Sequence, residues 1–336
     1  MKLSTMGDMA QATLLRRETG RVRNEMNRLT AELGSGRKSD LQGALRGKFA
    51  PVAGLERSLA LGSAFQISGA SVGRLAEGQQ IALERVQATL TSAGPEFLKV
   101  ASMGEETQLD VTLSNARRQL EGVISALNTT TESQSLFSGA ATDRPALAPP
   151  ADILAALETA VAGALTPTDL IDAVNIWFDT PGGGFDTVAY TGSTTARDPV
   201  AIADGESEAL TFMANDPAIR ETIKGLAVAA VMDRGILGGD MVAQKAVLQS
   251  MGSVLLGATD QLTAARADIG FAQARIDAVQ TRGAAEAAGF EQALSALRDA
   301  DPYETASRLQ QVQAQLETLY TVTARISRLS LTSFMR

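Results

Sequence analysis

The chain has 336 residues, of which 45% are hydrophobic and 20% are charged, and its formal net charge at pH 7 is −8. This balance is typical of a folded chain rather than a disordered one. The sequence contains no cysteine and no histidine, which excludes disulfides, thiolate nucleophiles, the usual zinc sites and the commonest general base of enzymes. No pair of carboxylates stands out either, so we expect no enzyme, no cofactor and no metal site.

The charge is distributed unevenly along the chain. Six basic and four acidic residues lie between Met1 and Leu33, whereas two basic and twelve acidic residues lie between Ala141 and Ile219. An acidic centre argues against nucleic acid as a partner. The longest apolar run, Leu226 to Met232, is too short to cross a bilayer, so we expect no membrane insertion. The N-terminus lacks the apolar segment of a cleavable signal peptide.

A helix is predicted over the first 33 residues, because apolar residues recur there at alternating spacings of three and four. Gly34-Ser35-Gly36 should end it. Residues 37–54 are typical of a linker with room for one short helix. The residues of this N-terminal stripe are Ala12, Leu15, Thr19, Val22, Met26, Leu29 and Leu33.

Two long helices should follow, the first from about Leu55 to a kink or break at Gly94-Pro95. The second should run from Glu105 to about Ser133 as its antiparallel partner. Beyond Pro149-Pro150 the pattern predicts short helices over 153–164 and 168–177. Short strands are predicted over 185–191, 200–203 and 208–213, after a glycine loop that lacks the context of a phosphate site.

Helical periodicity returns after Pro217. It predicts a compact helix from Ile219 to Met232 and a heptad run from Met241 to Leu297, which as one helix would span about 85 Å. Asp301-Pro302-Tyr303-Glu304 is typical of a final helix start. The stripe that follows comprises Leu309, Val312, Leu316, Leu319, Thr323, Ile326 and Ser330, and the chain ends with the apolar residues Leu329, Leu331, Phe334 and Met335.

The fold class expected is mainly α: an elongated, nested helical rod of long antiparallel helices with coiled-coil termini and a small mixed α/β central insert. We divide the chain into an N-terminal assembly helix (1–36), rod helices of the N-terminal half (37–140), an acidic central insert with short strands (141–216), rod helices of the C-terminal half (217–300) and a C-terminal assembly helix (301–336). The two terminal stripes could pair with each other, with other subunits, or both.

Three sets of residues carry a resemblance to a known family. Leu136-Phe137-Ser138-Gly139, followed by Thr142-Asp143 and Pro145, is similar to a leucine-phenylalanine-glycine turn. Tyr190-Thr191-Gly192-Ser193, with 200–205 after it, is similar to a β insert. Arg266-Ala267-Asp268-Ile269-Gly270 and Ser327-Arg328-Leu329-Ser330-Leu331 complete the set. Together they resemble the flagellin superfamily and, within it, the family of hook-filament junction proteins (hook-associated protein 3). Ser39-Asp40 departs from that family's double aspartate and proline, so residues 37–54 transfer least.

The resemblance implies a structural subunit of the bacterial flagellum that joins hook to filament outside the cell. It implies export through the flagellar type III apparatus, a cytoplasmic chaperone before export, self-assembly into a ring or helix, and neighbouring hook-associated protein and flagellin as partners. The implied assembly interface comprises Leu15, Val22, Met26, Leu29, Leu33, Leu309, Val312, Leu316, Leu319, Ile326, Leu329, Leu331 and Phe334.

Two alternatives stay open from the sequence. A flagellin-type filament subunit belongs to the same structural class, and the preference for the junction family over it rests mainly on the turn at Leu136 to Pro145. An acidic module that holds a ligand or calcium belongs to a different class. The spacing of Asp198, Asp204, Glu206 and Glu208 does not match an EF-hand loop, which disfavours this second alternative.

Overall fold

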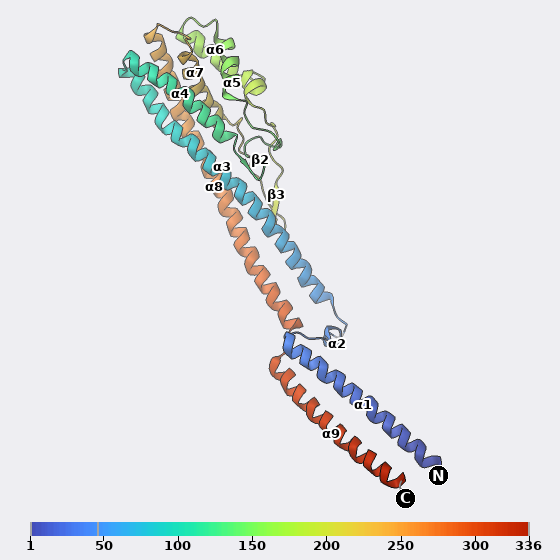
Figure 1. Cartoon of the computed structure of the whole chain (residues 1–336). Coiled ribbons are helices and arrows are strands. Elements are labelled where there is room, and N and C mark those ends of the chain that lie inside the picture. The colour runs from blue at the N-terminus through green and yellow to red at the C-terminus, as the bar shows by residue number, and fades with distance from the viewer. Residues whose placement is uncertain (1, 46, 335–336) are drawn as a thin grey trace. The chain divides into compact units, whose positions relative to one another are not determined.

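The computed structural model describes residues 2–45 and 47–334, with side chains for residues 10, 13–45 and 47–326. Contacts group the chain into two compact units, Met1–Leu61 with Ala285–Arg336 (unit 1) and Gly62–Ala284 (unit 2). The mainly α fold with long helices and short strands is confirmed (Figure 1). Within the described parts of the chain, no helix is both long and apolar enough to cross a membrane.

Unit 1 contains both chain ends. Its elements are α1 (Lys2–Ser35), α2 (Leu41–Ala44), the first part of α3 (Ala50–Met103), the last part of α8 (Met241–Arg298) and α9 (Pro302–Phe334). The predicted end of α1 and the predicted start of α9 are confirmed. α1 stops before Gly36, whose φ of +69° suits glycine. Asp301 caps α9, because its Oδ1 accepts hydrogen bonds from the backbone N–H groups of Tyr303 (2.8 Å) and Glu304 (3.1 Å).

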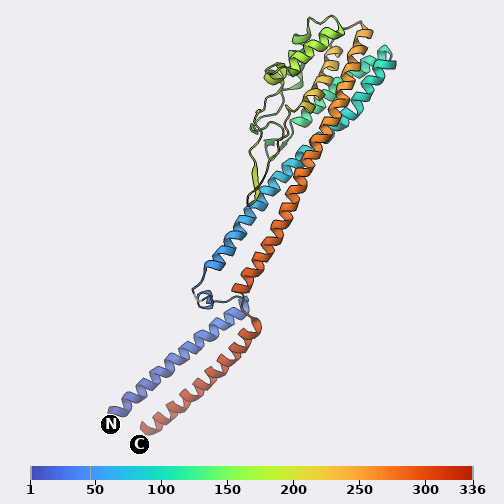
Figure 2. The same cartoon turned by 180° about the vertical axis from the view of Figure 1, so that it is seen from behind.

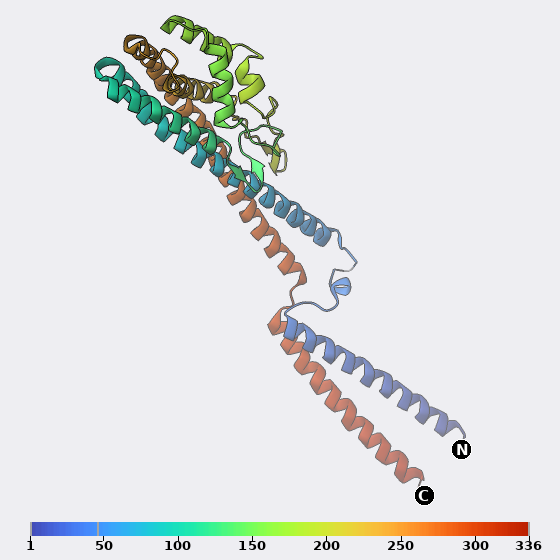
Figure 3. The ribbon, with the colours of Figure 1, turned by 45° about the horizontal axis from the view of Figure 1, so that its top comes forward.

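Unit 2 holds the remaining parts of α3 and α8 together with the central elements. Its helices are α4 (Glu106–Leu127), α5 (Pro150–Val161), α6 (Pro167–Asp179), the π-helical turn η1 (Phe185–Ala189) and α7 (Pro217–Asp233). Two antiparallel two-stranded sheets accompany them, β1 (Thr130–Thr131) with β2 (Gln134–Ser135) and β3 (Val200–Ala203) with β4 (Glu206–Glu208). Turned views show α3, α4, α7 and α8 packed side by side in unit 2 (Figures 2 and 3).

The core of unit 2 surrounds α7, which is buried on all faces from Ala218 to Met232 except at Arg220 and Glu221. Such a helix must lie inside a bundle. Glycines let the neighbouring helices approach closely. A Cβ on Gly225 would lie 2.6 Å from the Leu255 side chain, and one on Gly252 would lie 2.9 Å from Leu98. Gly225 and Gly252 lower the helix propensity of their segments, but they allow the neighbouring helices to pack closely.

A kink or a break was predicted at Gly94-Pro95. No break occurs there, since α3 runs through both residues. Pro95 removes the hydrogen bond to the carbonyl of Thr91, and both residues are exposed, so water can satisfy that carbonyl. Gly94 is buried instead, and a Cβ there would lie 3.2 Å from Leu256. Packing on one face and solvent on the other allow the helix to continue.

The second rod helix was predicted to reach Ser133, but α4 ends at Leu127. Glu132 and Ser133 have positive φ values of 53° and 64° and form the turn between β1 and β2. The Asn128 side chain ends the helix by pairing with the backbone of Leu147, donating to its carbonyl and accepting from its N–H at 2.9 Å each. Helical periodicity cannot reveal such a long-range pair.

Of the three predicted strands, only the one over residues 200–203 has the predicted bounds. Residues 185–189 form η1 instead, and the last strand, β4, stops at Glu208. The reason for η1 is aromatic packing. The Phe185 ring lies 5.7 Å from the Phe178 ring, and the Arg220 guanidinium lies 4.3 Å from its centroid.

Two of the segments that carry the family resemblance, the turn at Leu136–Gly139 and the segment Tyr190–Ser193, pack against each other. Backbone N–H groups of Ser193 and Ala140 donate to the carbonyls of Ser138 (2.8 Å) and Thr195 (2.9 Å). Gly139 has a φ of +61°, and a Cβ there would lie 2.5 Å from the Thr195 carbonyl oxygen. Only glycine fits this position.

Tyr190 fastens the same junction, since its hydroxyl donates to the Ser193 carbonyl at 2.6 Å. Burial raises the pKa of Tyr190 to about 12. Between pH of about 10 and about 12, the folded protein therefore keeps the phenolic proton of Tyr190, whereas the unfolded chain, with an ordinary pKa of about 10, has lost it.

We expect the free energy of unfolding of unit 2 to fall as the pH rises from about 10 to about 12. The stabilisation is complete below the unfolded pKa and disappears as the pH passes the folded pKa. Denaturation across this range, with tyrosinate absorbance, checks it. Tyr190→Phe should remove this part of the slope, and an unchanged slope would contradict the assignment.

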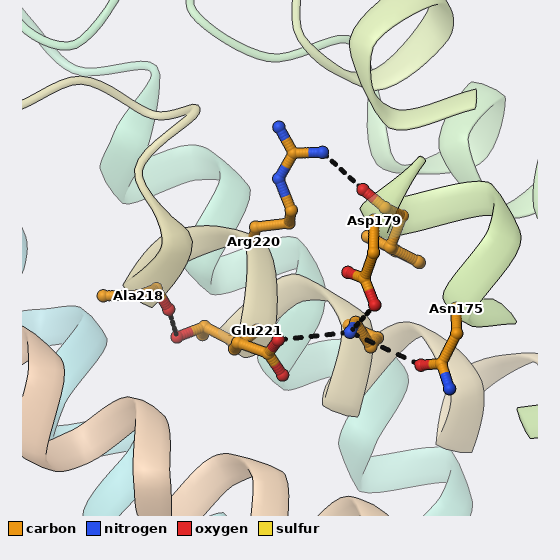
Figure 4. A network of polar contacts seen from close by, with 8 residues as sticks. Asn175, Asp179, Ala218, Arg220 and Glu221 are labelled. Atoms are coloured by element: carbon orange, nitrogen blue, oxygen red, sulfur yellow. Dashed lines mark hydrogen bonds and ion pairs between the residues drawn. The ribbon is translucent and has the colours of Figure 1, made fainter. Parts of the chain in front are cut away.

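A buried lysine joins α6 to α7, and Figure 4 labels its acceptors Asn175, Asp179 and Glu221. Lys224 is 3% exposed, and its Nζ donates to Asp179 Oδ2 (2.7 Å), Glu221 Oε1 (3.1 Å) and Asn175 Oδ1 (3.5 Å). Arg220, one turn earlier, donates to the Phe178 carbonyl. A charge taken out of water in this way is tolerated because every donor has a partner.

Removing both carboxylates with Asp179→Asn and Glu221→Gln should lower the free energy of unfolding by about 3–5 kcal/mol, because the ammonium then stays buried without a counter-charge. Lys224→Met should change it by less than about 1 kcal/mol. Chemical denaturation measures both. Asp172→Asn, at an exposed acid of α6, is the matched control. Equal effects of the double variant and the control would refute the proposed importance of the pair.

Candidate assembly surface of the terminal helices

The two terminal helices lie side by side and antiparallel (Figures 1 and 2). The residues predicted as an assembly stripe mostly face the contact between α1 and α9. Val22 and Leu29 are 3% and 2% exposed. The half-buried members are Leu15, Met26, Leu309, Val312, Leu316, Leu319 and Ile326.

The remaining predicted stripe residues do not share this position. Leu33 is 41% exposed, although its spacing matches the stripe. It precedes the end of α1, where the partner helix is only starting. The side chains of Leu329, Leu331 and Phe334 lie outside the described residues. The two terminal stripes were expected to pair with each other, with other subunits, or both. In the structure they pair with each other. A role of the stripes in contacts between copies stays a prediction.

The helices are joined at their common end by a short antiparallel bridge between Arg37 and Asp299. The backbone N–H of Lys38 donates to the Arg298 carbonyl, and that of Ala300 donates to the Gly36 carbonyl, at 2.9 Å each. We call residues 36–38 and 298–300 the joint. The sequence marks both segments as helix ends but carries no signal that they pair.

Side chains reinforce the joint. Glu32 Oε1 accepts from the Ser39 N–H at 2.9 Å, and Lys38 Nζ donates to the Leu297 carbonyl at 3.3 Å. A groove of about 270 Å³ beside them is lined by Arg28, Glu32, Lys38, Asp301 and Arg308, among others. The groove therefore carries charged side chains of both signs.

Further apolar residues, which the predicted stripe does not include, are exposed on these two helices. Leu14 is 63% exposed, Tyr303 86%, Tyr320 46% and Val322 39%. They could have been found from the heptads, since each stands at a flanking or outer position of an otherwise polar face. Exposed apolar side chains on a helix pair are candidates for contact with another protein.

Leu29→Ala should lower the stability of the terminal helix pair by about 2 kcal/mol or more, because a fully buried leucine is truncated. Leu33→Ala, the matched control one turn on, should change it by less than about 0.5 kcal/mol. Circular dichroism of the full chain would follow the melting of this helix pair. Similar losses for the two variants would show that Leu29 is not buried as described.

The acidic central region does not gather a metal site in the residues described, where no cluster of three or more potential ligands is suited to a metal ion. Two of its acids pair with arginines of α8 instead. Glu208 Oε2 lies 3.4 Å from Arg275 Nη1, and Glu206 pairs with Arg282. The Ser68 hydroxyl also donates to the Ala201 carbonyl at 2.6 Å, which ties the hairpin to α3.

Comparisons with known proteins agree with this arrangement. Residues 253–335, from within α8 through α9, match the family model of the bacterial flagellin C-terminal helical region. A structure from Vibrio parahaemolyticus, assigned as a flagellar hook-associated protein, is 14% identical with a TM-score of 0.51. The match covers 72% of this chain and 93% of that chain.

The structure of FlgL from Bacillus cereus is 15% identical with a TM-score of 0.52, and the match covers 71% of this chain and 97% of that chain. A search of curated proteins by sequence found no match. In sequence, residues 253–335 are similar to the flagellin C-terminal helical region. In fold, the chain is similar to the two solved flagellar structures.

Proposed function

We propose that the protein is a hook-filament junction subunit, which assembles outside the cell between the hook and the filament of the bacterial flagellum. The observation that carries the proposal is the turn at Leu136–Pro145, which resembles that of the junction family and packs against Tyr190–Thr195 in unit 2. The C-terminal flagellin region and the fold shared with two solved flagellar proteins support the same class.

The proposed assembly segments are residues 1–36 and 301–336, which provide α1 and α9. Export in an unfolded state through the flagellar type III apparatus belongs to the proposal, together with a cytoplasmic chaperone that covers the apolar terminal stripes beforehand. Neighbouring hook-associated protein and flagellin are the proposed partners. Their contacts with this chain would be packing contacts rather than catalytic ones.

Deleting residues 330–336, or introducing a charge at Leu316 or Leu319, should abolish incorporation into the flagellum. A charge in the half-buried stripe disrupts the terminal pair, while unit 2 has its own core. Flagella isolated from the variant strains would be probed with antibody. Circular dichroism should show that the truncated protein keeps most of its helix, and loss of most of it would contradict the independence of unit 2.

Loss of the protein should leave hooks that release flagellin into the medium without holding a filament. A strain that lacks it and still builds normal filaments would refute the junction role. The flagellin alternative is separated by immunoelectron microscopy with an antibody against residues 141–216. One band at the hook supports the junction, and label along the whole filament supports a filament subunit. A calcium titration without binding would remove the acidic-module alternative.

A further inference from the structure

We propose that a cavity in unit 2, between the start of α4 and the turn from α7 to α8, binds an arginine side chain of a partner protein. Apolar residues of the same partner segment would pack around its mouth. The site goes beyond the proposed function and lies wholly within unit 2. The turns from α3 to α4 and from α7 to α8 lie together at one end of this unit (Figures 1 and 2).

The cavity has acidic walls. Its volume is about 310 Å³, and it is lined by Glu106 and Asp110 of α4 and by Asp233 of α7, whereas none of its described lining residues is basic. Glu106 and Asp110 are exposed and form no ion pair with any residue that the structure describes. They stand four positions apart on one helix face, where like charges repel. A cation between them would relieve this repulsion.

A buried amide faces the same cavity from α8. Gln244 lines the cavity although it is only 9% exposed. Its backbone N–H donates to the Asp240 carbonyl at 3.0 Å, but its side-chain amide has no hydrogen-bond partner among the described residues. A buried amide without a partner is unfavourable and rare. Its carbonyl oxygen is therefore a free acceptor for a ligand that enters the cavity.

The end of α7 adds a negative potential. Asp233, in the last turn of this helix, lines the cavity, and that turn contains no basic residue. The carbonyl end of a helix favours a cation. The starts of α4 and α8 have the opposite polarity, but an acidic residue precedes each of them, namely Glu105 and Asp240. Asp240 Oδ1 accepts from the Ala243 N–H at 2.9 Å.

The basic residues of these segments do not neutralise the α4 carboxylates. Arg117 Nε lies 3.3 Å from Asp233 Oδ2, and Arg234 pairs with Glu158 at 2.9 Å. Lys245 forms no ion pair with a described residue. None of the three basic residues lines the cavity. Arg117 thus balances the carboxylate of α7, and the two carboxylates of α4 keep their charge without a counter-ion.

The spread of the acceptors favours a guanidinium group. Among the described residues, no cluster of three or more potential ligands is suited to a metal ion, so the carboxylates do not converge on one point. An ammonium group is a compact point charge, whereas a planar guanidinium presents several N–H donors in a fixed fork and reaches acceptors that lie apart. Arginine is also enriched where partner proteins bind most tightly.

Apolar side chains beside the cavity indicate a protein as the source of this guanidinium. Met103 is 76% exposed at the end of α3, and Met241 and Val242 are 39% and 79% exposed at the start of α8. A small free cation would leave this apolar surface in water. An arginine with apolar neighbours would cover it, and the flexible methionines can adapt to its shape.

Methyl NMR of the full chain, labelled at its methionine methyl groups, tests the site. Met232 and Met241 line the cavity, and Met26, between α1 and α9, is the internal control. The probes are acetyl-Leu-Arg-Leu-amide and the same peptide with citrulline, whose neutral urea replaces the guanidinium. The arginine peptide should shift the Met232 and Met241 signals at millimolar concentration, and the citrulline peptide should need about tenfold more. The Met26 signal should not move.

Each outcome decides the proposal. Selective shifts from the arginine peptide support it. Equal shifts from the two peptides, or none from the arginine peptide at millimolar concentration, overturn it. Shifts of Met232 and Met241 that grow with the concentration of the chain alone would show that a second copy fills the cavity, and would also overturn it. The junction role is measured separately in flagella, so either proposal can fail without the other.

Variants locate the binding and exclude a purely structural role. Glu106→Gln with Asp110→Asn should weaken binding of the arginine peptide about tenfold, and Gln244→Leu about fivefold. Glu121→Gln, at an exposed acid of α4 outside the cavity, is the matched control and should leave binding unchanged. Asp110→Asn should not lower the melting temperature, because it removes a repulsion. A lower melting temperature with unchanged binding would assign Asp110 to folding and would overturn the site.

Discussion

The pairing of the first helix with the last is the constraint on which unit 1 depends. Neither α1 nor α9 has another described partner of comparable extent, and a single amphipathic helix in water is marginal at best. Val22 and Leu29 reach full burial only because α9 covers them. The joint sets the register of this pairing, since its two backbone hydrogen bonds fix Gly36 opposite Ala300.

In unit 2, an acidic region of mixed structure packs against long helices. Its apolar residues surround α7, and its polar ties are specific. Lys224 connects α6 to α7, while Glu206 and Glu208 meet arginines of α8. These pairs neutralise part of the acidity of residues 141–219 within unit 2.

The helices were predictable where periodicity and end signals agree. α8 was expected from Met241 to Leu297 and runs to Arg298, and α7 was placed within two residues. Errors arose where a distant contact decides the local structure. Asn128 ends α4 by pairing with Leu147, and Phe185 joins a π-helical turn because Phe178 and Arg220 pack on it. In the candidate site, heptads identified the stripe, but only the structure showed that Leu33 is left exposed and that the outer residues Leu14 and Tyr320 flank the pair.

The joint also has a consequence for the order in which the chain acquires structure. Lys38 bonds to Leu297 across 259 positions of sequence, so the terminal pair contains the most distant contacts of the chain, and closing so long a loop is slow. Unit 2 can satisfy its own core before the two ends meet. A chain threaded through a narrow channel cannot form the terminal pair until both of its ends have emerged. The terminal pair would therefore form last, after the whole subunit has left the channel.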